Sequence, residues 1–252
     1  MSADLILITG ATGNTGSALL QQLRGRGAQV RAMVRGQSGT TRLPDPSVET
    51  VVADFDDPSS IDAALRGVAR AYLVTLSGPH AEAQQVRFAE SAAAADVQHL
   101  VKLSQFAADE VSPVRFLRYH AAVERRIREL GLPFTFLRPN LYLQGLLAFQ
   151  GMIASEGRFM APIGDARVSA VDVRDIAAVA AFALTQGGHE GKTYTITGPS
   201  TVTHGEMASA IGAAIGRWRT ALRRNRRTRA RAAARSSADK TGGSQQSATA
   251  SP

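Results

Sequence analysis

The feature that most constrains the fold of this chain is a glycine-rich turn near the N-terminus, set between an apolar run and an amphipathic segment. Residues 4–9 form the apolar run, and residues 10–16 follow it with the sequence Gly-Ala-Thr-Gly-Asn-Thr-Gly. Leucine and alanine then recur at helical spacing over residues 17–26, and residues 29–34 alternate as a second strand. A glycine turn that joins a strand to a helix suits the binding of a pyrophosphate at the helix N-terminus. The pattern predicts a dinucleotide-binding strand–helix–strand unit, and the alternative is a tight turn without a ligand.

Each glycine of this turn has its own physical task. Gly10 permits a sharp exit from the strand, Gly13 leaves room for phosphates beside backbone N–H groups, and Gly16 lets the helix pack on the sheet. Three further side chains of the turn can add hydrogen-bond donors to the same ligand. These are Thr12, Asn14 and Thr15.

The residue that follows the second strand indicates which dinucleotide is bound. An NAD site usually carries an acid there for the ribose 2′-hydroxyl, whereas this chain has Arg35. A guanidinium suits a 2′-phosphate through charge-assisted hydrogen bonds, so the sequence favours NADPH over NADH. The alternative is that Arg35 is a solvated charge. Asp54 and Phe55 follow the third strand and are expected to flank the adenine ring, unless they are a helix-capping Asp and a core Phe.

Composition limits the cellular and chemical possibilities. The chain has 252 residues and no cysteine, which excludes a disulfide framework, a thiolate zinc site and a cysteine nucleophile, and fits a reducing cytosol. We expect a cytoplasmic protein without membrane contact, because no basic region precedes an apolar segment at the N-terminus and no apolar run approaches the roughly 20 residues that cross a bilayer. The histidines lack metal-ligand spacing, so no metal is expected.

Strand-like runs alternate with helical segments as far as residue 139, which is typical of a Rossmann-type α/β fold with a doubly wound parallel sheet. Further strands are predicted at 48–52, 71–76, 99–103 and 134–138. Helices are predicted at 59–65, with Ser59 or Ser60 as its N-cap, at 80–95 and at 115–130.

The rhythm changes after Pro139, where a small substrate lobe interleaved with the end of the sheet is expected over residues 139–216. It comprises a loosely helical stretch at 141–151, a loop at 157–164, strands at 168–171 and 193–196, and helices at 172–185 and 204–215. Together with the preceding residues this lobe gives an NAD(P)-binding domain over residues 1–216.

The basic character of the chain belongs to its last residues. Residues 217–252 hold ten Lys/Arg and one acid, whereas residues 1–216 hold 19 basic and 20 acidic residues. We expect 217–252 to be a disordered tail. Its composition is that of a GC-rich gene read out of frame, so a frameshift near Arg217 that truncates the C-terminal lobe is the preferred explanation. The alternative is a basic arm that binds nucleic acid through phosphates, and nucleic acid is otherwise not expected as a partner.

Three short motifs follow one another along the chain, and their combination in this order identifies a family. They are Ile-Thr-Gly-Ala-Thr-Gly-Asn-Thr-Gly at 8–16, Leu-Arg-Pro-Asn at 137–140 and Val-Asp-Val-Arg-Asp-Ile-Ala at 171–177, supported by 130–136 and 191–199. Over residues 3–216 the chain resembles the NmrA-like group of atypical short-chain dehydrogenases/reductases. The resemblance implies either an NAD(P)H-dependent quinone or dye reductase, or a redox-sensing regulator that binds NADP and a protein partner without turnover.

One departure from the wider superfamily bears on the chemistry. Most members place Tyr and Lys at i and i+4 on the helix predicted at 115–130, and this chain has Phe116 and His120 there. Tyr119 is about 100° round the helix from His120, so it is not expected to replace the missing tyrosine. Reduction of a ketone gives an alkoxide, with a conjugate-acid pKa near the ~15.7 of water, and needs a positioned acid. Reduction of a quinone gives a phenolate-like anion, with a pKa nearer ~10. The departure therefore favours a quinone-like or dye-like acceptor, or no chemistry at all.

Three residues are expected beside a small-molecule acceptor. Ser104 matches the serine position of the superfamily and would orient a carbonyl, unless it is a turn serine. His120 would donate a proton or contact the nicotinamide ribose, and the alternative is a helix-face histidine bound to a carbonyl. Tyr142, with Asn140, is expected to line the acceptor pocket or to pack in the core.

Overall fold

The computed structural model describes residues 4–43, 45, 47–161, 164–216 and 222–223. The chain divides into two compact units, the first of Met1–Ala148 and Val168–Thr201 and the second of Phe149–Arg167 and Val202–Pro252. The predicted tail, and with it the frameshift near Arg217, lies outside the described residues apart from the strand β11 (Leu222–Arg223).

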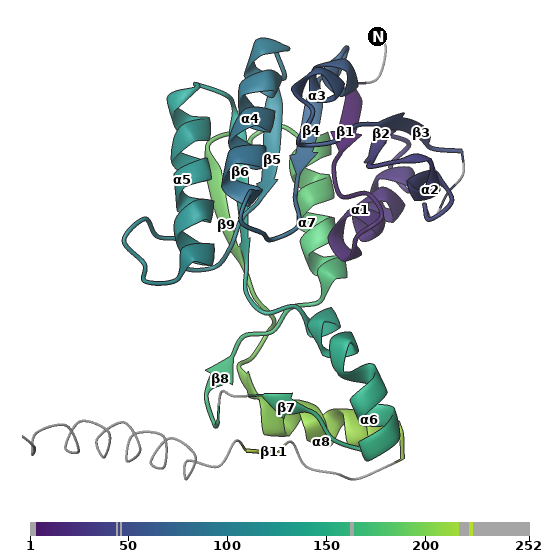
Figure 1. Ribbon diagram of the computed structural model, residues 1–252, viewed down its shortest axis with the longest axis vertical. Helices are drawn as coiled ribbons and strands as arrows, with labels where there is room; N and C mark the ends of the chain where they lie inside the picture. Colours follow the sequence, from purple (N-terminus) through teal and green to yellow (C-terminus); the bar gives the residue numbers. More distant parts are fainter. Residues whose placement is uncertain (1–3, 44, 46, 162–163, 217–221, 224–252) are drawn as a thin grey trace, which may run out of the picture. The chain divides into compact units, whose positions relative to one another are not determined.

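A seven-stranded parallel sheet forms the centre of the first unit (Figure 1). Its strand order is β3-β2-β1-β4-β5-β6-β9. The strands are β1 (Leu5–Ile8), β2 (Gln29–Val34), β3 (Glu49–Val52), β4 (Arg70–Leu73), β5 (His99–Leu103), β6 (Phe134–Pro139) and β9 (Lys192–Ile196). The order changes direction between β1 and β4, and ligands of open α/β sheets bind at such a point, outside the carboxyl ends of the strands. The predicted Rossmann-type sheet is confirmed.

Helices cover both faces of this sheet and create two separate cores. Because successive strand residues point to opposite faces, Ile6 and Ile8 enter one core and Leu7 the other. The first core is closed by α1 (Asn14–Arg24) and α7 (Val173–Thr185), and the second by α3 (Pro58–Leu65), α4 (Ala81–Ala94) and α5 (Arg115–Glu129). The short helix α2 (Gln37–Thr40) follows β2.

Several element boundaries differ from the sequence prediction. The N-cap of α3 is Asp57, not Ser59 or Ser60, because its carboxylate accepts the N–H groups of both serines at 3.0 and 3.4 Å and Pro58 stands at the first helical position. The strand predicted at 168–171 is replaced by β8 (Arg167–Val168) and an isolated bridge from Val171 to Tyr142. The predicted loop at 157–164 contains β7 (Met160–Ala161).

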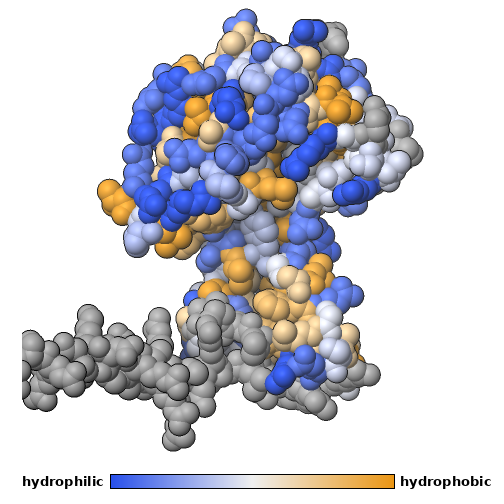
Figure 2. All heavy atoms as spheres, in the orientation of Figure 1, coloured by the Kyte–Doolittle hydropathy of each residue, from blue (hydrophilic) through white to orange (hydrophobic). Residues whose placement is uncertain are grey.

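The second unit is small and mainly helical. It contains α6 (Gln150–Glu156), which follows the 3₁₀ helix η1 (Leu143–Phe149) at the end of the first unit, and β10 (Val202–Thr203), which precedes α8 (His204–Ala214). A capping box of Thr203 and Glu206 starts α8. The Phe159 ring is 2% exposed and stacks on Phe149 at 5.4 Å between centroids. Apolar side chains gather on the face of this unit seen in Figure 2. None of the helices in the described segments has the length and apolar character needed to span a bilayer.

Candidate cofactor and substrate site

The glycine turn is packed so closely that two of its positions accept no side chain. Gly10 has a φ of 58°, and a Cβ there would lie 2.6 Å from Val74 Cγ1. A Cβ on Gly16 would lie 2.2 Å from the carbonyl oxygen of Gly10. The positive φ of Gly10 agrees with its predicted sharp exit from the strand, whereas Gly16 is needed for the close approach of α1 to the turn itself.

Thr9 fixes the turn to the neighbouring strand. Its buried hydroxyl accepts the N–H of Val74 at 2.8 Å and lies 3.0 and 2.9 Å from the carbonyl oxygens of Tyr72 and Val74, either of which can take its proton. The carboxyl ends of β1 and β4 are thereby held in one register. The sequence analysis did not single out Thr9.

Helix α1 begins without a side-chain cap. Its N-cap is Gly13, which has an extended backbone, and the first turn contains no acidic residue. The unpaired N–H groups and the positive end of the helix dipole are therefore available to an anion. Of the predicted donor side chains, Thr12 and Asn14 are exposed at this end and Thr15 is buried.

The residues predicted to contact the adenosine half follow the ends of β2 and β3, two adjacent strands in which Val34 pairs with Val52. Arg35 is exposed directly after β2, and its guanidinium has no hydrogen bond or ion pair to another described residue. Phe55 is half-buried and packs on Phe88 with ring centroids 5.8 Å apart, and the Asp54 carboxylate accepts the N–H of Asp56 at 3.0 Å. Phe55 thus lies against the core, as the alternative interpretation anticipated.

A cavity of about 420 Å³ opens at the carboxyl ends of β1, β4, β5 and β6. It brings together the three predicted acceptor residues, Ser104, His120 and Tyr142, with Thr15 from the start of α1. Its other lining residues come from the ends of β4 and β5, from α4 and α5, and from the segment after β6: Val74, Thr75, Ser77, Gln85, Leu103, Gln105, Phe116, Tyr119, Asn140, Leu141 and Gly145.

One wall of the cavity is a cluster of three rings on α5. Phe116, Tyr119 and His120 stand at i, i+3 and i+4, and the His120 ring centroid lies 4.9 Å from that of Phe116 and 4.3 Å from that of Tyr119. Tyr119 also lines the cavity, because residues at this spacing share one face of the helix; whether it replaces the missing tyrosine stays a prediction. The Tyr119 hydroxyl lies 3.2 Å from Ser77 Oγ, and burial raises its pKa.

His120 is backed by a buried lysine that the sequence analysis missed. Lys102, on β5, is fully buried, and its Nζ lies 2.8 Å from Nδ1 of His120 and 3.4 Å from the carbonyl oxygen of Leu103. Burial lowers the pKa of Lys102 to about 7, although Glu124 acts in the opposite direction. Burial, together with the charge of Lys102, lowers the pKa of His120 to about 2, so the imidazole is neutral at neutral pH. While Lys102 is an ammonium it can only donate, so Nδ1 of His120 then accepts and the ring proton lies on Nε2.

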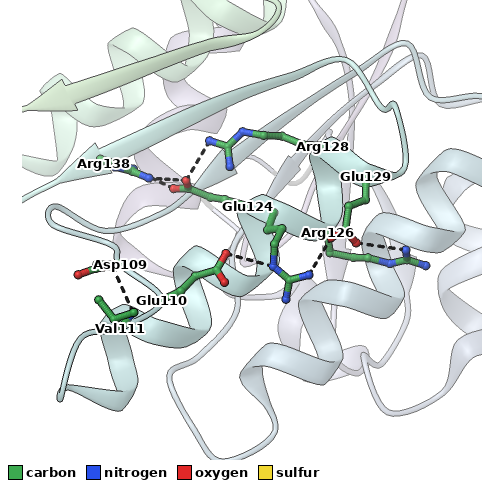
Figure 3. A network of polar contacts seen from close by, with 9 residues as sticks. Asp109, Glu110, Val111, Glu124, Arg126, Arg128, Glu129 and Arg138 are labelled. Carbon is green, nitrogen blue, oxygen red and sulfur yellow. Dashed lines mark hydrogen bonds and ion pairs between the residues drawn. The ribbon is translucent and has the colours of Figure 1, made fainter.

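A second buried group, Glu124 on α5, contacts Arg138 on β6 and Arg128, as Figure 3 shows, and it also binds Ser104 at the end of β5. Its carboxylate accepts Arg138 Nε at 2.9 Å and Nη2 at 2.5 Å, and Ser104 Oγ at 2.5 Å. Arg128 Nη2 lies 3.4 Å away. Burial alone would raise the pKa of Glu124, but the hydrogen bonds from Arg138 and Ser104 outweigh it and lower the pKa. The Ser104 hydroxyl donates its single proton to Glu124. Toward a molecule in the cavity it can therefore act only as a hydrogen-bond acceptor.

Tyr142 and Asn140 form the part of the cavity wall that follows β6. Tyr142 is half-buried and forms a backbone bridge with Val171. Burial, with a smaller effect of Tyr119, raises the pKa of Tyr142 to about 12, so its hydroxyl remains a neutral donor. The Asn140 amide donates to Ser169 Oγ at 2.8 Å.

Other predicted roles can be read from the same structure. Asp172 is the N-cap of α7, and its carboxylate accepts the N–H of Arg174 at 2.8 Å. In the described part of the chain no three His, Asp or Glu side chains converge on a point where a metal ion would bind.

Comparison with known proteins gives consistent matches over most of the chain. The model of the NmrA-like family matches residues 2–223. The chain is 35% identical over 213 residues to the NAD(P)H azoreductase of Xenophilus azovorans, covering 84% of this chain and 74% of that protein. It is 39% identical over 214 residues to a (4-alkanoyl-5-oxo-2,5-dihydrofuran-3-yl)methyl phosphate reductase of Streptomyces griseus, with the same coverage of 84% and 74%. An NADPH-dependent quinone oxidoreductase from Escherichia coli, solved in complex with NADPH, superposes with a TM-score of 0.78 at 28% identity over 86% of this chain and 78% of that chain.

Proposed function

Because the chain belongs to the NmrA-like family, we propose that it is an NADPH-dependent reductase that transfers hydride to a quinone-like or dye-like acceptor. The observation that carries the proposal is the cavity at the carboxyl ends of β1, β4, β5 and β6, which joins the start of α1 to the ring cluster of α5. The names of two relatives agree with this reading, since an azoreductase and a quinone oxidoreductase are among them, whereas the Streptomyces griseus reductase is named for a dihydrofuranone substrate.

The residues around the glycine turn fit a dinucleotide. The uncapped N-terminus of α1 offers N–H groups to a pyrophosphate, and Gly13 keeps the approach to them free of a side chain. The guanidinium of Arg35, which has no partner among the described residues, fits a 2′-phosphate, and for this reason we propose NADPH in preference to NADH. Asp54 and Phe55 remain proposed neighbours of the adenine through their position after β3. When bound, the cofactor supplies a hydride.

The acceptor side of the cavity supports a reaction that needs little acid catalysis. Phe116 has no proton to give, so the donors that line the cavity include the Nε2–H of His120 and the hydroxyls of Tyr119 and Tyr142. Ser104 contributes an acceptor oxygen and holds its place through Glu124. A quinone that takes a hydride becomes a phenolate-like anion, which these neutral donors stabilise by hydrogen bonds. A ketone would become an alkoxide and would demand a stronger acid.

Reduction assays with a panel of acceptors test the proposal. NADPH absorbance is followed with a benzoquinone, a naphthoquinone, an azo dye and an aliphatic ketone, and each rate is corrected for the reaction without protein. We expect turnover with the quinones or the dye and none with the ketone. Saturable NADP⁺ binding in a calorimeter without turnover of any acceptor would contradict the proposal and favour the regulator. Equal rates with the ketone would contradict the chemical argument.

A further inference from the structure

Lys102 occupies a position where a lysine is costly. It lies within a central parallel strand with no exposed surface, and its register neighbours are the apolar residues Leu73 on β4 and Phe136 on β6. An ammonium in such surroundings loses its hydration and needs a compensating partner. The nearest carboxylate, Glu124, already accepts hydrogen bonds from Arg138 and Ser104, and Lys102 forms no hydrogen bond with it. The side-chain partner of Lys102 is the neutral ring of His120.

The His120 ring separates Lys102 from the cavity. Nδ1 is held by Lys102, whereas Nε2 has no hydrogen bond to a described residue and is not among the enclosed, unpartnered atoms of the described chain. Since His120 is a cavity-lining residue, Nε2 is the ring nitrogen left for a molecule in the cavity. A proton can therefore pass from Nζ of Lys102 to Nδ1 of His120, while Nε2 of the same ring faces the cavity.

We propose that Lys102 is the proton source behind His120, and that the pair protonates the reduced acceptor through the imidazole. The inference rests on the proposed function, because it assigns the proton that accompanies the hydride. A neutral imidazole that gave up its Nε2 proton without replacement would become an anion within the protein wall. A group that gives a proton to Nδ1 at the same time keeps the imidazole neutral. Lys102 is in position to give that proton, since its Nζ lies 2.8 Å from Nδ1.

The proposed step balances in atoms and charge. A quinone becomes a quinol by gaining one hydride from NADPH and one proton, and an azo group becomes a hydrazine in the same way. The Nε2–H bond of His120 breaks as the new O–H or N–H bond of the product forms, and an Nζ–H bond of Lys102 breaks as an Nδ1–H bond forms. Lys102 is left as a neutral amine and the imidazole stays neutral. After product leaves, a proton from bulk solvent reaches Nε2 through the cavity, and the Nδ1 proton returns to Lys102, so each turnover takes up one proton from solvent.

The surroundings of Lys102 set the pH range in which this source is charged. The titratable and charged groups that face it are His120 and Glu124 on α5 and Arg138 on β6. With the pKa of Lys102 lowered to about 7, the ammonium is present below neutral pH and is lost as the pH rises above it. We therefore expect the kcat for acceptor reduction at saturating NADPH to fall with rising pH above about 7.

Two measurements test the inference, one of them independent of catalysis. Histidine ¹⁵N–¹H correlation spectra of the full chain report which ring nitrogen of His120 carries the proton, and we expect Nε2–H at pH 6. In Lys102→Met, Nδ1 loses its donor and we expect the Nδ1–H form to appear. Lys192→Met, which removes an exposed lysine on β9, is the matched control and should leave the His120 signal unchanged.

The kinetic arm uses the same variants with NADPH and a quinone. Lys102→Met is expected to lower kcat about tenfold to a hundredfold, at the low end of general acid effects because a phenolate-like product needs little help. It should also lose the fall in kcat above pH 7, while the dissociation constant for NADP⁺ stays unchanged. Unaltered NADP⁺ binding also shows that the variant is folded.

The possible outcomes distinguish failure of the Lys102–His120 proton relay, meaning proton transfer from Lys102 through His120 to the acceptor, from failure of the proposed function. An Nδ1–H form in the wild-type protein at pH 6 would overturn the inference without any variant. Wild-type turnover that Lys102→Met leaves unaltered in rate and pH profile would overturn the relay alone. Failure of the wild-type protein to reduce any acceptor would overturn the proposed function, and the relay with it, whatever the tautomer.

Discussion

Replacement of Arg138 by methionine tests the energetic reasoning about the Glu124 network. Glu124 has a side-chain exposure of 1%, and Arg138 donates two of its hydrogen bonds, at 2.9 and 2.5 Å. Breaking a buried pair by removing one partner costs about 3–5 kcal/mol. Arg138 is itself 26% exposed, and Ser104 and Arg128 remain beside the carboxylate, so we place the expected loss near the lower end, about 2–3 kcal/mol. For a chain of this size that corresponds to a fall in Tm of roughly 4–12 °C.

The pH dependence of this loss has a definite sign. In the wild-type protein the pKa of Glu124 is lowered, so its contribution to stability is present above its unfolded pKa and is lost as the pH falls through the folded pKa. Without Arg138, burial raises the pKa, and the buried charge then destabilises the fold until it is protonated. The difference in unfolding free energy between wild type and Arg138→Met should therefore be largest near pH 7 and shrink toward pH 5.

Urea unfolding at pH 7, 6 and 5 measures this difference. Arg125→Met is the control. Arg125 pairs with Glu129 on the exposed surface of α5, the helix that carries Glu124, and solvent screens that pair. Adding Glu124→Gln to Arg138→Met removes the unpaired charge and should restore part of the stability. A loss that equals that of Arg125→Met, or one that grows as the pH falls, would refute the reasoning.

Three further predictions concern the dinucleotide site and its supports. Arg35→Asp should weaken NADP⁺ binding, measured by calorimetry, about tenfold to a hundredfold and NAD⁺ binding far less. The control Arg66→Asp changes another exposed arginine, at the end of α3, and should alter neither affinity. Gly16→Ala should abolish saturable NADP⁺ binding and lower the Tm, because the added Cβ would lie 2.2 Å from a backbone oxygen. The control Gly25→Ala, whose Cβ would have no contact under 3.6 Å, should be tolerated, and equal effects of the two variants would contradict the packing argument. Asp57→Ala should speed amide exchange within α3, and unchanged protection would show that this cap is dispensable.

The parts of the fold that were predictable are those that local pattern determines. The apolar run before Gly10 and the helical spacing after Gly16 belong to one continuous segment, and the parallel sheet follows from the alternation of such segments. The family assignment rests on short motifs and is confirmed by the match over residues 2–223.

The contacts that complete the site were not predictable, because they join residues far apart in sequence. Lys102 reads as one residue of an apolar strand, and nothing local places it beside His120. Glu124 reads as an ordinary helix acid, although Ser104 and Arg138 enclose it. The place of Tyr119 in the cavity wall was not predictable either, because helical angle alone does not say how wide a cavity is.

The order in which the chain builds its first unit has a consequence for synthesis on the ribosome. The nascent chain completes β6, leaves the first unit after residue 148 and returns only at residue 168, so β9, the strand that pairs with β6, arrives last. Until residue 196 has emerged, the backbone groups of β6 face outward as an open edge that another polypeptide can pair with. Translational pausing before that point should therefore promote aggregation, whereas pausing after it should not.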